Sequence, residues 1–259
     1  MNTTKSFTLP AELSSIWNLI KIISFTKDVT ICKVQNTETK IDYILKIYAS
    51  HIFSKRKKES LSNITDSHFL LSKEHHHIHH REYVFYPLEE SLKEILYDTG
   101  LSFHDLLCLG THMIDAISIL CDTGIYEADI SPCNIYRNSR GIFCLGDINL
   151  EKCTILGTHP YVAPEYTRPL TDEHAFKAAM QYSICSLLYS ICKLQKDFLF
   201  DEMQDILSRG MAKDPSDRFA SLTELKRALA SLSSHEKTQK LSNLLLHREN
   251  HPLFYTKTM

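Results

Sequence analysis

The stretch EADISPCNIYRNSRGIFCLGDIN, residues 127–149, decides how this chain is interpreted. It contains Asp129, then Asn134 five positions later, then Asp147 beyond a short predicted hairpin. Carboxylate and amide oxygens are ligands that suit Mg²⁺. The order and spacing are typical of phosphoryl transfer from Mg-ATP, in which one Asp orients an attacking hydroxyl while the Asn and the second Asp hold the metal.

The composition excludes several classes of protein. With 259 residues, of which 43% are hydrophobic, the chain can bury one large core or two lobes that share a cleft. The formal net charge of −2 gives no general attraction to nucleic acid, so we expect no nucleic-acid partner. The N-terminus, MNTTKSFTLPAEL, lacks the pattern of a signal peptide. The longest apolar run, SICSLLYSIC, is too short to span a membrane.

The eight cysteines indicate a reducing compartment. They are spread singly and form no C-x-x-C pair, so zinc ribbons and redox dithiols are not expected. Five of them lie in apolar patterns, where a free cysteine packs as a small hydrophobe: Cys32, Cys108, Cys121, Cys185 and Cys192. The sequence therefore predicts a soluble, cytoplasmic protein.

The hydrophobic pattern of the first third predicts strands. Within residues 16–48, DVTICKVQ alternates and YILKIY follows a polar turn. Residues 54–63 are polar and permit a helix. Residues 68–88 are predicted to form a second hairpin, from HFLLSKE to REYVFYPL, with a histidine-rich tip.

The remainder of the chain changes to helical periodicity from Ser91 onward. Ser102 is the expected N-cap of a long helix. Its buried stripe is predicted to contain Leu106, Met113, Ile114, Ile117 and Leu120. Short strands are expected on both sides of the turn RNSRG, and helices from residue 170 to about residue 233. This succession indicates an α+β protein with two lobes.

Four further motifs accompany the opening stretch: YILKIY with Lys46, GTHPYVAPE at residues 157–165, the apolar run QYSICSLLYSIC, and KDPSDRF with Arg218. In this order they resemble a eukaryotic-type (Hanks-type) protein kinase domain, in the compact style of bacterial serine/threonine kinases. The resemblance extends from about Ile16 to Leu232, which is nearly the whole chain.

The resemblance implies a fold, cofactors and partners. A small N-lobe with a β-sheet and one helix is expected at residues 10–88, and a larger, mainly α-helical C-lobe at residues 89–233. Residues 234–259 are a polar tail. ATP and Mg²⁺ are the implied cofactors, and a protein is the implied substrate or regulated partner.

The resemblance also implies a role for each matched residue. Lys46 corresponds to the strand lysine that pairs with the nucleotide phosphates, and Glu59 is the best candidate for its partner. Asp129 corresponds to the aspartate that orients the substrate hydroxyl. Asn134 and Asp147 correspond to the two magnesium ligands.

The motif GTHPYVAPE resembles the end of a kinase activation segment, with Ala163-Pro164-Glu165 at its close. Arg218 corresponds to a late arginine that pairs with this glutamate in the family. We therefore expect an ion pair between Arg218 and Glu165.

The phosphate-covering loop departs from the family pattern. Ser24, Thr26 and Val29 stand where three glycines are usual, and glycine allows the backbone to approach phosphate closely. The hydroxyls of Ser24 and Thr26 could bond to phosphate instead. Ile31 is assigned to the nucleotide site, as is Ile44, which replaces a smaller residue over the adenine and narrows the purine slot.

The catalytic loop departs as well. It reads Glu127-Ala128-Asp129 where the family has H-R-D, so the usual receiver of an activation-loop phosphate is missing. Ser131 replaces a lysine, which can cost roughly 10²- to 10³-fold in rate. The motif D-F-G has become Asp147-Ile148-Asn149, and Met180 replaces an aspartate that braces the loop.

Three other features have a functional and an ordinary interpretation. The run from His75 to His80 could chelate a metal through His75, His77 and His79, although a solvated hairpin is favoured. The basic run at residues 55–58 is favoured as a solvated helix face. Thr154 and Thr158 are candidate phosphorylation sites.

The preferred hypothesis is an atypical serine/threonine protein kinase that is not gated by loop phosphorylation. The alternative is a pseudokinase, a binding module with weak or no turnover. A small-molecule kinase shares the Asp and Asn motifs, but GTHPYVAPE and Arg218 favour the protein kinase branch.

Overall fold

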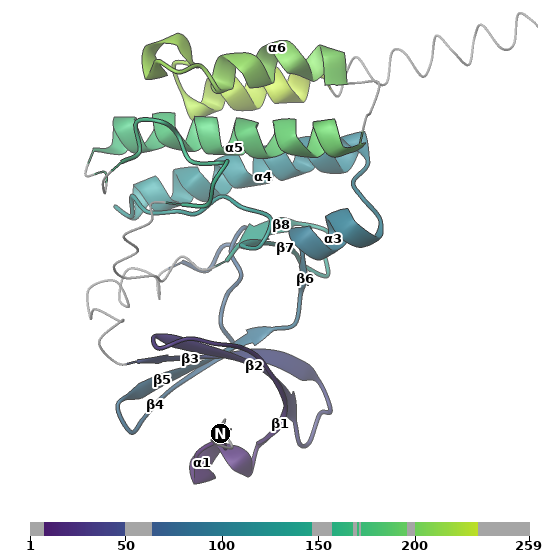
Figure 1. Ribbon diagram of the computed structural model, residues 1–259, viewed down its shortest axis with the longest axis vertical. Helices are drawn as coiled ribbons and strands as arrows, with labels where there is room; N and C mark the ends of the chain where they lie inside the picture. The colour runs from purple at the N-terminus through teal and green to yellow at the C-terminus, as the bar shows by residue number, and fades with distance from the viewer. Residues whose placement is uncertain are drawn as a thin grey trace, which may run out of the picture.

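The computed structural model describes residues 8–49, 64–146, 157–167, 170, 172–195 and 200–232. Within them a sheet-rich lobe and a helical lobe follow one another along the longest axis of the molecule (Figure 1). The predicted α+β architecture is confirmed. The expected lobe boundary, between residues 88 and 89, falls in the connection between strands β5 and β6.

The N-terminal lobe is built on one five-stranded antiparallel sheet with the order β1-β2-β3-β5-β4. Its strands are β1 (Trp17–Phe25), β2 (Val29–Asn36), β3 (Asp42–Ala49), β4 (Glu74–Ile78) and β5 (Arg81–Pro87). The alternation in β2 buries Thr30, Cys32 and Val34, as a period of two requires. The strands predicted within residues 16–48 are confirmed.

The face of this sheet that points away from the helical lobe is closed by an aromatic cluster. The Trp17 indole stacks on Phe85 with ring centroids 4.4 Å apart and meets Tyr43 edge-on at 5.0 Å. The short helix α1 (Ala11–Ser14) adds Leu13 to this cluster (Figure 1). The sequence did not predict α1, because four residues are too few to carry a helical period.

The second predicted hairpin begins later than expected. Residues 68–70 do not pair with β5; Leu70 N–H donates to Leu145 O at 2.9 Å, and Leu145 N–H donates to His68 O at 2.8 Å. The prediction that HFLLSKE forms the first strand of this hairpin was therefore wrong, because the start of that segment bonds to the helical lobe. Strand β4 begins at Glu74 and contains three of the histidines.

Only His79 and His80 occupy the tip of the hairpin. Their φ angles of 47° and 61° lie in the left-handed region. Two consecutive residues with positive φ are what a two-residue type I′ turn needs. The positive φ angles therefore place the turn at His79 and His80, while the three preceding histidines belong to strand β4.

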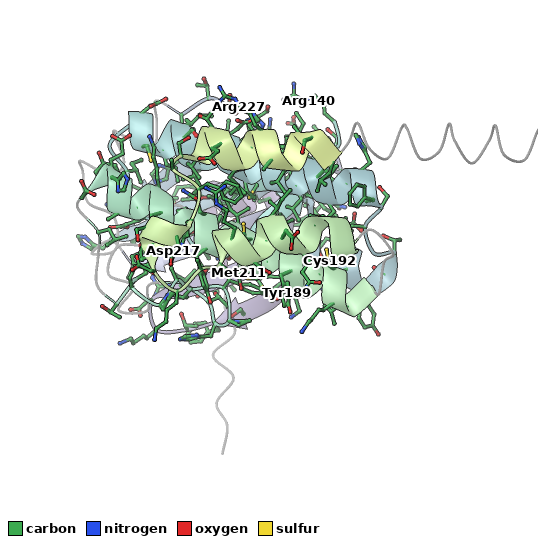
Figure 2. The ribbon with its side chains drawn as sticks, turned by 90° about the horizontal axis from the view of Figure 1, so that it is seen from above. Arg140, Tyr189, Cys192, Met211, Asp217 and Arg227 are labelled. Atoms are coloured by element: carbon green, nitrogen blue, oxygen red, sulfur yellow. The ribbon has the colours of Figure 1, made fainter. Side chains whose placement is uncertain are left out.

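The helical lobe carries a three-stranded sheet with the order β6-β7-β8 against its helices. Its elements are β6 (Glu90–Ser91), α3 (Leu92–Asp98), α4 (Phe103–Asp122), β7 (Ile135–Arg137), β8 (Phe143–Leu145), α5 (Glu173–Gln195), α6 (Phe200–Gly210), a 3₁₀ turn (Pro215–Asp217) and a helix at residues 222–232. The last helix lies alongside α6 at the end of the molecule farthest from the five-stranded sheet (Figures 1 and 2).

Helix α4 is the central helix of this lobe. It begins with the predicted N-cap, Ser102, whose side chain and that of Asp105 form a reciprocal capping box. All five residues of the predicted stripe are buried. Within the described chain, α4 is the one helix long and apolar enough to cross a membrane by length and composition; 56% of that window is buried inside the protein, as in a core helix.

We expect Trp17→Ala to destabilise the protein by about 3–5 kcal/mol, because the indole fills the centre of the aromatic cluster and its removal leaves a cavity. Trp17 is 2% exposed, whereas Ile20 on the same strand is 51% exposed. Ile20→Ala is the matched control and should cost no more than about 0.5 kcal/mol. Urea unfolding measures both values, and equal losses would contradict the assigned role of Trp17.

Candidate active site

Asp129 lies in the loop between α4 and β7, and its carboxylate is held by one residue of the same loop and by one that is 29 positions later. The Asn134 side-chain amide donates to Oδ2 at 2.8 Å. Thr158 donates its backbone N–H to Oδ1 at 2.9 Å and its hydroxyl to Oδ2 at 2.8 Å. Hydrogen bonds to a charged group are about twice as strong as neutral ones, so three donors fix the orientation of this carboxylate.

Asn134 is positioned by its own backbone. Its N–H donates to Ser131 O at 3.0 Å, and its carbonyl accepts the Gly146 N–H at 2.7 Å. The side-chain Nδ2 is engaged with Asp129, while no donor among the described residues bonds to Oδ1. An amide oxygen in this state fits the predicted role of a magnesium ligand.

The end of β8 is brought close to this loop by Gly146. A Cβ atom at this position would lie 2.6 Å from Cε2 of Tyr136, which is closer than real contacts allow. The glycine therefore permits the bond to Asn134. Asp147 and Glu59, the predicted metal ligand and lysine partner, lie outside the described residues, so their roles stay predictions.

Lys46 lies in β3 on the face of the sheet opposite the Trp17 cluster. It is 5% exposed, and its Nζ lies 5.4 Å from the centre of the Tyr86 ring. Its cross-strand neighbours are Ile31 on β2 and Val84 on β5. The register therefore places the predicted nucleotide residues Ile31 and Lys46 side by side.

Ile44 is paired with Tyr86 across β3 and β5, on the same face as Lys46. Tyr86 was not identified from the sequence, because the register of β3 against β5 cannot be read from either strand alone. Knowledge of the register would have identified Tyr86. It stands two residues after Val84, the partner of Lys46, and therefore on the same face of the sheet. Two large side chains therefore stand together where the family pattern has a smaller residue over the adenine.

The hairpin between β1 and β2 is a tight turn closed by Thr26. The Thr26 N–H and hydroxyl both donate to Val29 O at 2.9 Å, and the Val29 N–H donates back to the Thr26 hydroxyl at 3.0 Å. The hydroxyl predicted to meet phosphate is therefore engaged within the turn. Ser24, the other residue predicted to replace a glycine, is exposed on β1.

The approach of Thr158 to Asp129 depends on Gly157. Its φ of 112° lies in a region that side-chain-bearing residues rarely adopt. A Cβ atom there would also meet Val162 Cγ2 at 3.0 Å and Asp129 Oδ1 at 3.6 Å. The sequence named Thr158 only as a phosphorylation candidate; its contact with Asp129 spans 29 positions and carries no local signal.

The predicted ion pair between Arg218 and Glu165 is confirmed. The guanidinium donates to both carboxylate oxygens, at 2.6 and 2.8 Å, and two further N–H groups, on Nε and Nη1, donate to Ala212 O and Ala178 O. Tyr166, beside this pair, is buried, and burial together with the negative charges of Glu127 and Asp129 raises its pKa to about 12. The segment that carries Thr158 is thus anchored to the helical lobe.

Two side chains of the histidine run are bonded to a carboxylate on the neighbouring strand. His75 and His77 share one face of β4, as predicted, and both bond to the buried Glu82 on β5. The β4–β5 register, which cannot be read from the sequence of either strand alone, brings Glu82 opposite His77. Among the described residues, no group of three or more histidine, cysteine or acidic side chains is arranged to hold a metal ion.

Comparison with known proteins supports the fold. No protein-family model matches the chain. The serine/threonine-protein kinase AtPK1/AtPK6 of Arabidopsis thaliana is 30% identical over 156 residues, covering 49% of this chain and 33% of that protein. The chain therefore matches about a third of the length of this curated relative.

Two solved structures share the arrangement of the lobes. Rad53 1–466, in complex with AMP-PNP, gives a TM-score of 0.64 at 16% identity, over 83% of this chain and 65% of that chain. The Mycobacterium tuberculosis PknI kinase domain gives a TM-score of 0.57 at 16% identity, over 84% of this chain and 96% of that chain. The chain has a protein kinase fold.

Within this kinase fold the loop around Asp129 lacks polar supports that the family pattern has. Ser131, in the place of the loop lysine, is 1% exposed, and its Oγ has no hydrogen-bond partner among the described residues. Met180 is buried in the core of the helical lobe, and Ala128 packs against the same core. Met180 and Ala128 therefore make apolar contacts at positions where the family pattern has charged, hydrogen-bonded side chains.

We expect Arg218→Ala to destabilise the kinase fold by about 3–5 kcal/mol, because it leaves the Glu165 carboxylate without its partner in a partly buried position. Arg137→Ala is the matched control. Its ion pair with Glu90, at 2.9 Å, joins side chains that are 31% and 43% exposed, so its loss should cost no more than about 1 kcal/mol. Thermal unfolding compares the two variants, and similar values would contradict the anchoring role of Arg218.

Proposed function

We propose that this chain is an atypical serine/threonine protein kinase domain that transfers the γ-phosphate of ATP to a hydroxyl group of a protein. The observation that carries the proposal is the carboxylate of Asp129, held by Asn134 and Thr158 in a single orientation. Such a carboxylate can accept a hydrogen bond from a substrate hydroxyl and align its oxygen for attack.

Other residues would bind the nucleotide phosphates and the metal ion. Lys46, a nearly buried cation on a rigid strand, would hold nucleotide phosphates. The Oδ1 of Asn134 would bind Mg²⁺, together with Asp147. Mg²⁺ would neutralise charge that develops on the phosphate oxygens. Thr158 keeps Asp129 turned toward the bound hydroxyl through both of its donors.

The absence of an arginine beside Asp129 supports control that does not depend on loop phosphorylation. Ala128 stands in its place, so the catalytic loop offers no receiver for an activation-loop phosphate. The Thr158 hydroxyl is already bonded to Asp129. Its phosphorylation would put like charges in contact and would inhibit the enzyme rather than activate it.

The cysteines support a reducing cytoplasm for this activity. All seven cysteines of the described chain are free. Burial raises the pKa of Cys144 and that of Cys185 to about 12, so these thiols stay protonated and pack as apolar groups.

A pseudokinase is the second candidate, and the residues assigned to the nucleotide favour it. The Thr26 hydroxyl is engaged within its own turn, and Ile44 and Tyr86 narrow the site. The buried Ser131 supplies no cation. A small-molecule kinase is less favoured, because the segment at residues 157–167 is anchored by Arg218 in the manner of a peptide-docking shelf.

Incorporation of radiolabelled phosphate into a generic protein substrate tests catalysis. We expect Asp129→Asn to lower the initial rate roughly 100-fold or more, because an amide cannot accept the hydroxyl proton. Glu127→Gln is the matched control: it removes an exposed acid two residues away and should keep the rate within about threefold of the wild type. Equal incorporation by Asp129→Asn and the wild type would rule out the proposed catalytic role.

Thermal shift with ATP separates the kinase from the pseudokinase that binds no nucleotide. At ATP and Mg²⁺ near 100 times Kd, we expect a rise in Tm of roughly 5–10 °C, from the stabilisation that saturating ligand provides. EDTA and, separately, Asp147→Asn should each remove most of this rise. No shift with ATP and Mg²⁺ at millimolar concentration would favour the scaffold.

A further inference from the structure

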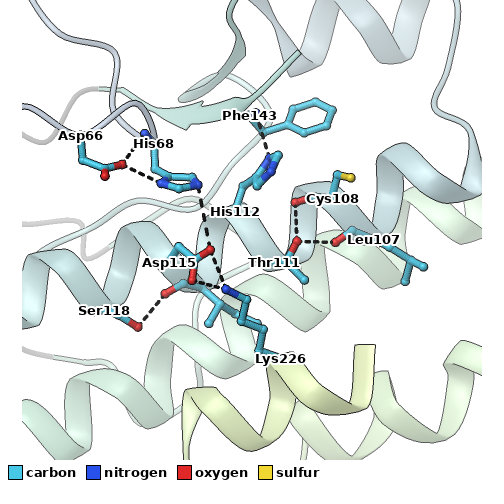
Figure 3. Close-up of polar contacts among 11 residues, drawn as sticks. Asp66, His68, Leu107, Cys108, Thr111, His112, Asp115, Ser118, Phe143 and Lys226 are labelled. Carbon is cyan, nitrogen blue, oxygen red and sulfur yellow. Dashed lines mark hydrogen bonds and ion pairs between the residues drawn. The ribbon is translucent and has the colours of Figure 1, made fainter. Parts of the chain in front are cut away.

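The outer edge of β8 carries an unusual hydrogen bond. In this three-residue strand the N–H groups of Phe143 and Leu145 point away from β7. Leu145 finds the backbone carbonyl of His68 at 2.8 Å, as in a sheet, but Phe143 donates to the Nδ1 atom of the His112 imidazole at 3.2 Å (Figure 3). The His112 side chain of α4 thus accepts the hydrogen bond that a backbone carbonyl of a neighbouring strand would accept in a sheet.

This bond fixes the state of the imidazole. A backbone N–H can only donate, so Nδ1 must carry a lone pair and the proton must be on Nε2. The bond exists with neutral His112 and is lost when Nδ1 is protonated. It therefore links the protonation of one side chain to the position of one strand.

The surroundings of His112 favour the neutral form. Burial, then the neighbouring His68, lower its pKa below the ordinary value, and Lys226 acts in the same direction, while Asp115 opposes them. The rings of His68 and His112 lie 5.3 Å apart. Lys226 is bonded to both oxygens of Asp115, at 2.5 and 2.7 Å, which reduces the pull of that carboxylate on a proton (Figure 3).

His68 has its own charged neighbours. Its Nδ1 bonds to Asp66 at 2.6 Å, and its Nε2 lies 4.0 Å from Asp115. Burial acts to raise the pKa of Asp66, but the hydrogen bonds and charge of His68, together with the charge of Arg140, outweigh it and lower this pKa. These groups, with Lys226, are the charges that face His112 in the described part of the chain.

The position of β8 is transmitted to the catalytic loop. Phe143 is three residues before Gly146, whose N–H donates to the Asn134 carbonyl at 2.7 Å. The same Asn134 donates its amide to Asp129 at 2.8 Å. A change at the Phe143 end of the strand therefore reaches the candidate magnesium ligand through a continuous backbone segment.

We propose that His112 is a positioning residue for the active site: its neutral imidazole holds β8 against the catalytic loop, and its protonation releases the strand and weakens binding of the Mg-nucleotide. This inference rests on the proposed function for its second part. The direction follows from linkage: a bond that needs neutral His112 is complete above the pKa of the folded protein and is lost as the pH falls through it. Since that pKa lies below 6.5, the loss is expected below pH 6.5.

The Kd for AMP-PNP with Mg²⁺, measured by calorimetry at pH 7.5 and pH 5.5, tests this inference. In the wild type, Kd should rise several-fold more between these pH values than in His112→Asn, because only the fraction of the protein with neutral His112 binds tightly. The asparagine keeps an acceptor atom near the Nδ1 position but cannot be protonated. His112→Leu, which has no acceptor, should bind weakly at both pH values. His104→Asn, on the exposed side of α4, is the matched control and should follow the wild type.

Hydrogen exchange at the Phe143 amide, corrected for the intrinsic rate, gives a readout that does not involve nucleotide. Protection should be lower in His112→Leu at pH 7.5 and in the wild type at pH 5.5, and should be retained in His112→Asn at both pH values. Circular dichroism establishes that each variant is folded. Equal protection in all variants, or parallel pH profiles of Kd in the wild type and His112→Asn, would overturn the inference.

The two proposals fail in different ways. If the wild type binds no nucleotide at pH 7.5, the proposed function fails and so does the part of the inference that concerns nucleotide. Hydrogen exchange then decides by itself whether His112 controls β8.

Discussion

The geometry of this protein depends on how the carboxylate of Asp129 is held. Its three donors come from Asn134 in the same loop and from Thr158, which is 29 positions later in the chain. Thr158 can reach it only because Gly157 adopts a positive φ and because the Arg218–Glu165 pair anchors the segment that follows. A charged group with this many donors has little freedom, so the loop between α4 and β7 is fixed at its centre.

The hydrogen bonds from Asn134 and Thr158 to Asp129 explain how this loop can lack the charged residues that the family pattern has around it. An ion pair or hydrogen-bonded charge in a protein interior can be replaced by apolar side chains of similar volume at little cost, provided that all partners change together. Met180 and Ala128 pack on the same core, and Glu127 is exposed. None of these three positions therefore places a charge in the core. Asp129 is oriented by Thr158 and Asn134 instead.

The sequence predicted the parts of the fold that carry a local period or a local cap. Strand β2 alternates, and α4 begins at a capping box. It also predicted the Arg218–Glu165 pair, through resemblance. The contacts of Tyr86 and His112 could not be predicted, because the first depends on strand register and the second spans 31 positions, and neither leaves a pattern in neighbouring residues.

The departures from the kinase pattern affect two different steps. The tight turn at Thr26 and the pairing of Ile44 with Tyr86 act where the nucleotide would bind in its ground state. Losses of that kind raise KM without changing the chemical step. Ser131 differs, because a cation near the transferring phosphate acts only as charge develops, so in the proposed kinase its absence would lower kcat. In the proposed kinase, the fixed Asp129 would orient the hydroxyl, so this is the part of catalysis for which the structure offers the most support. Nucleotide binding is the step that the departures at Thr26, Ile44 and Tyr86 would weaken.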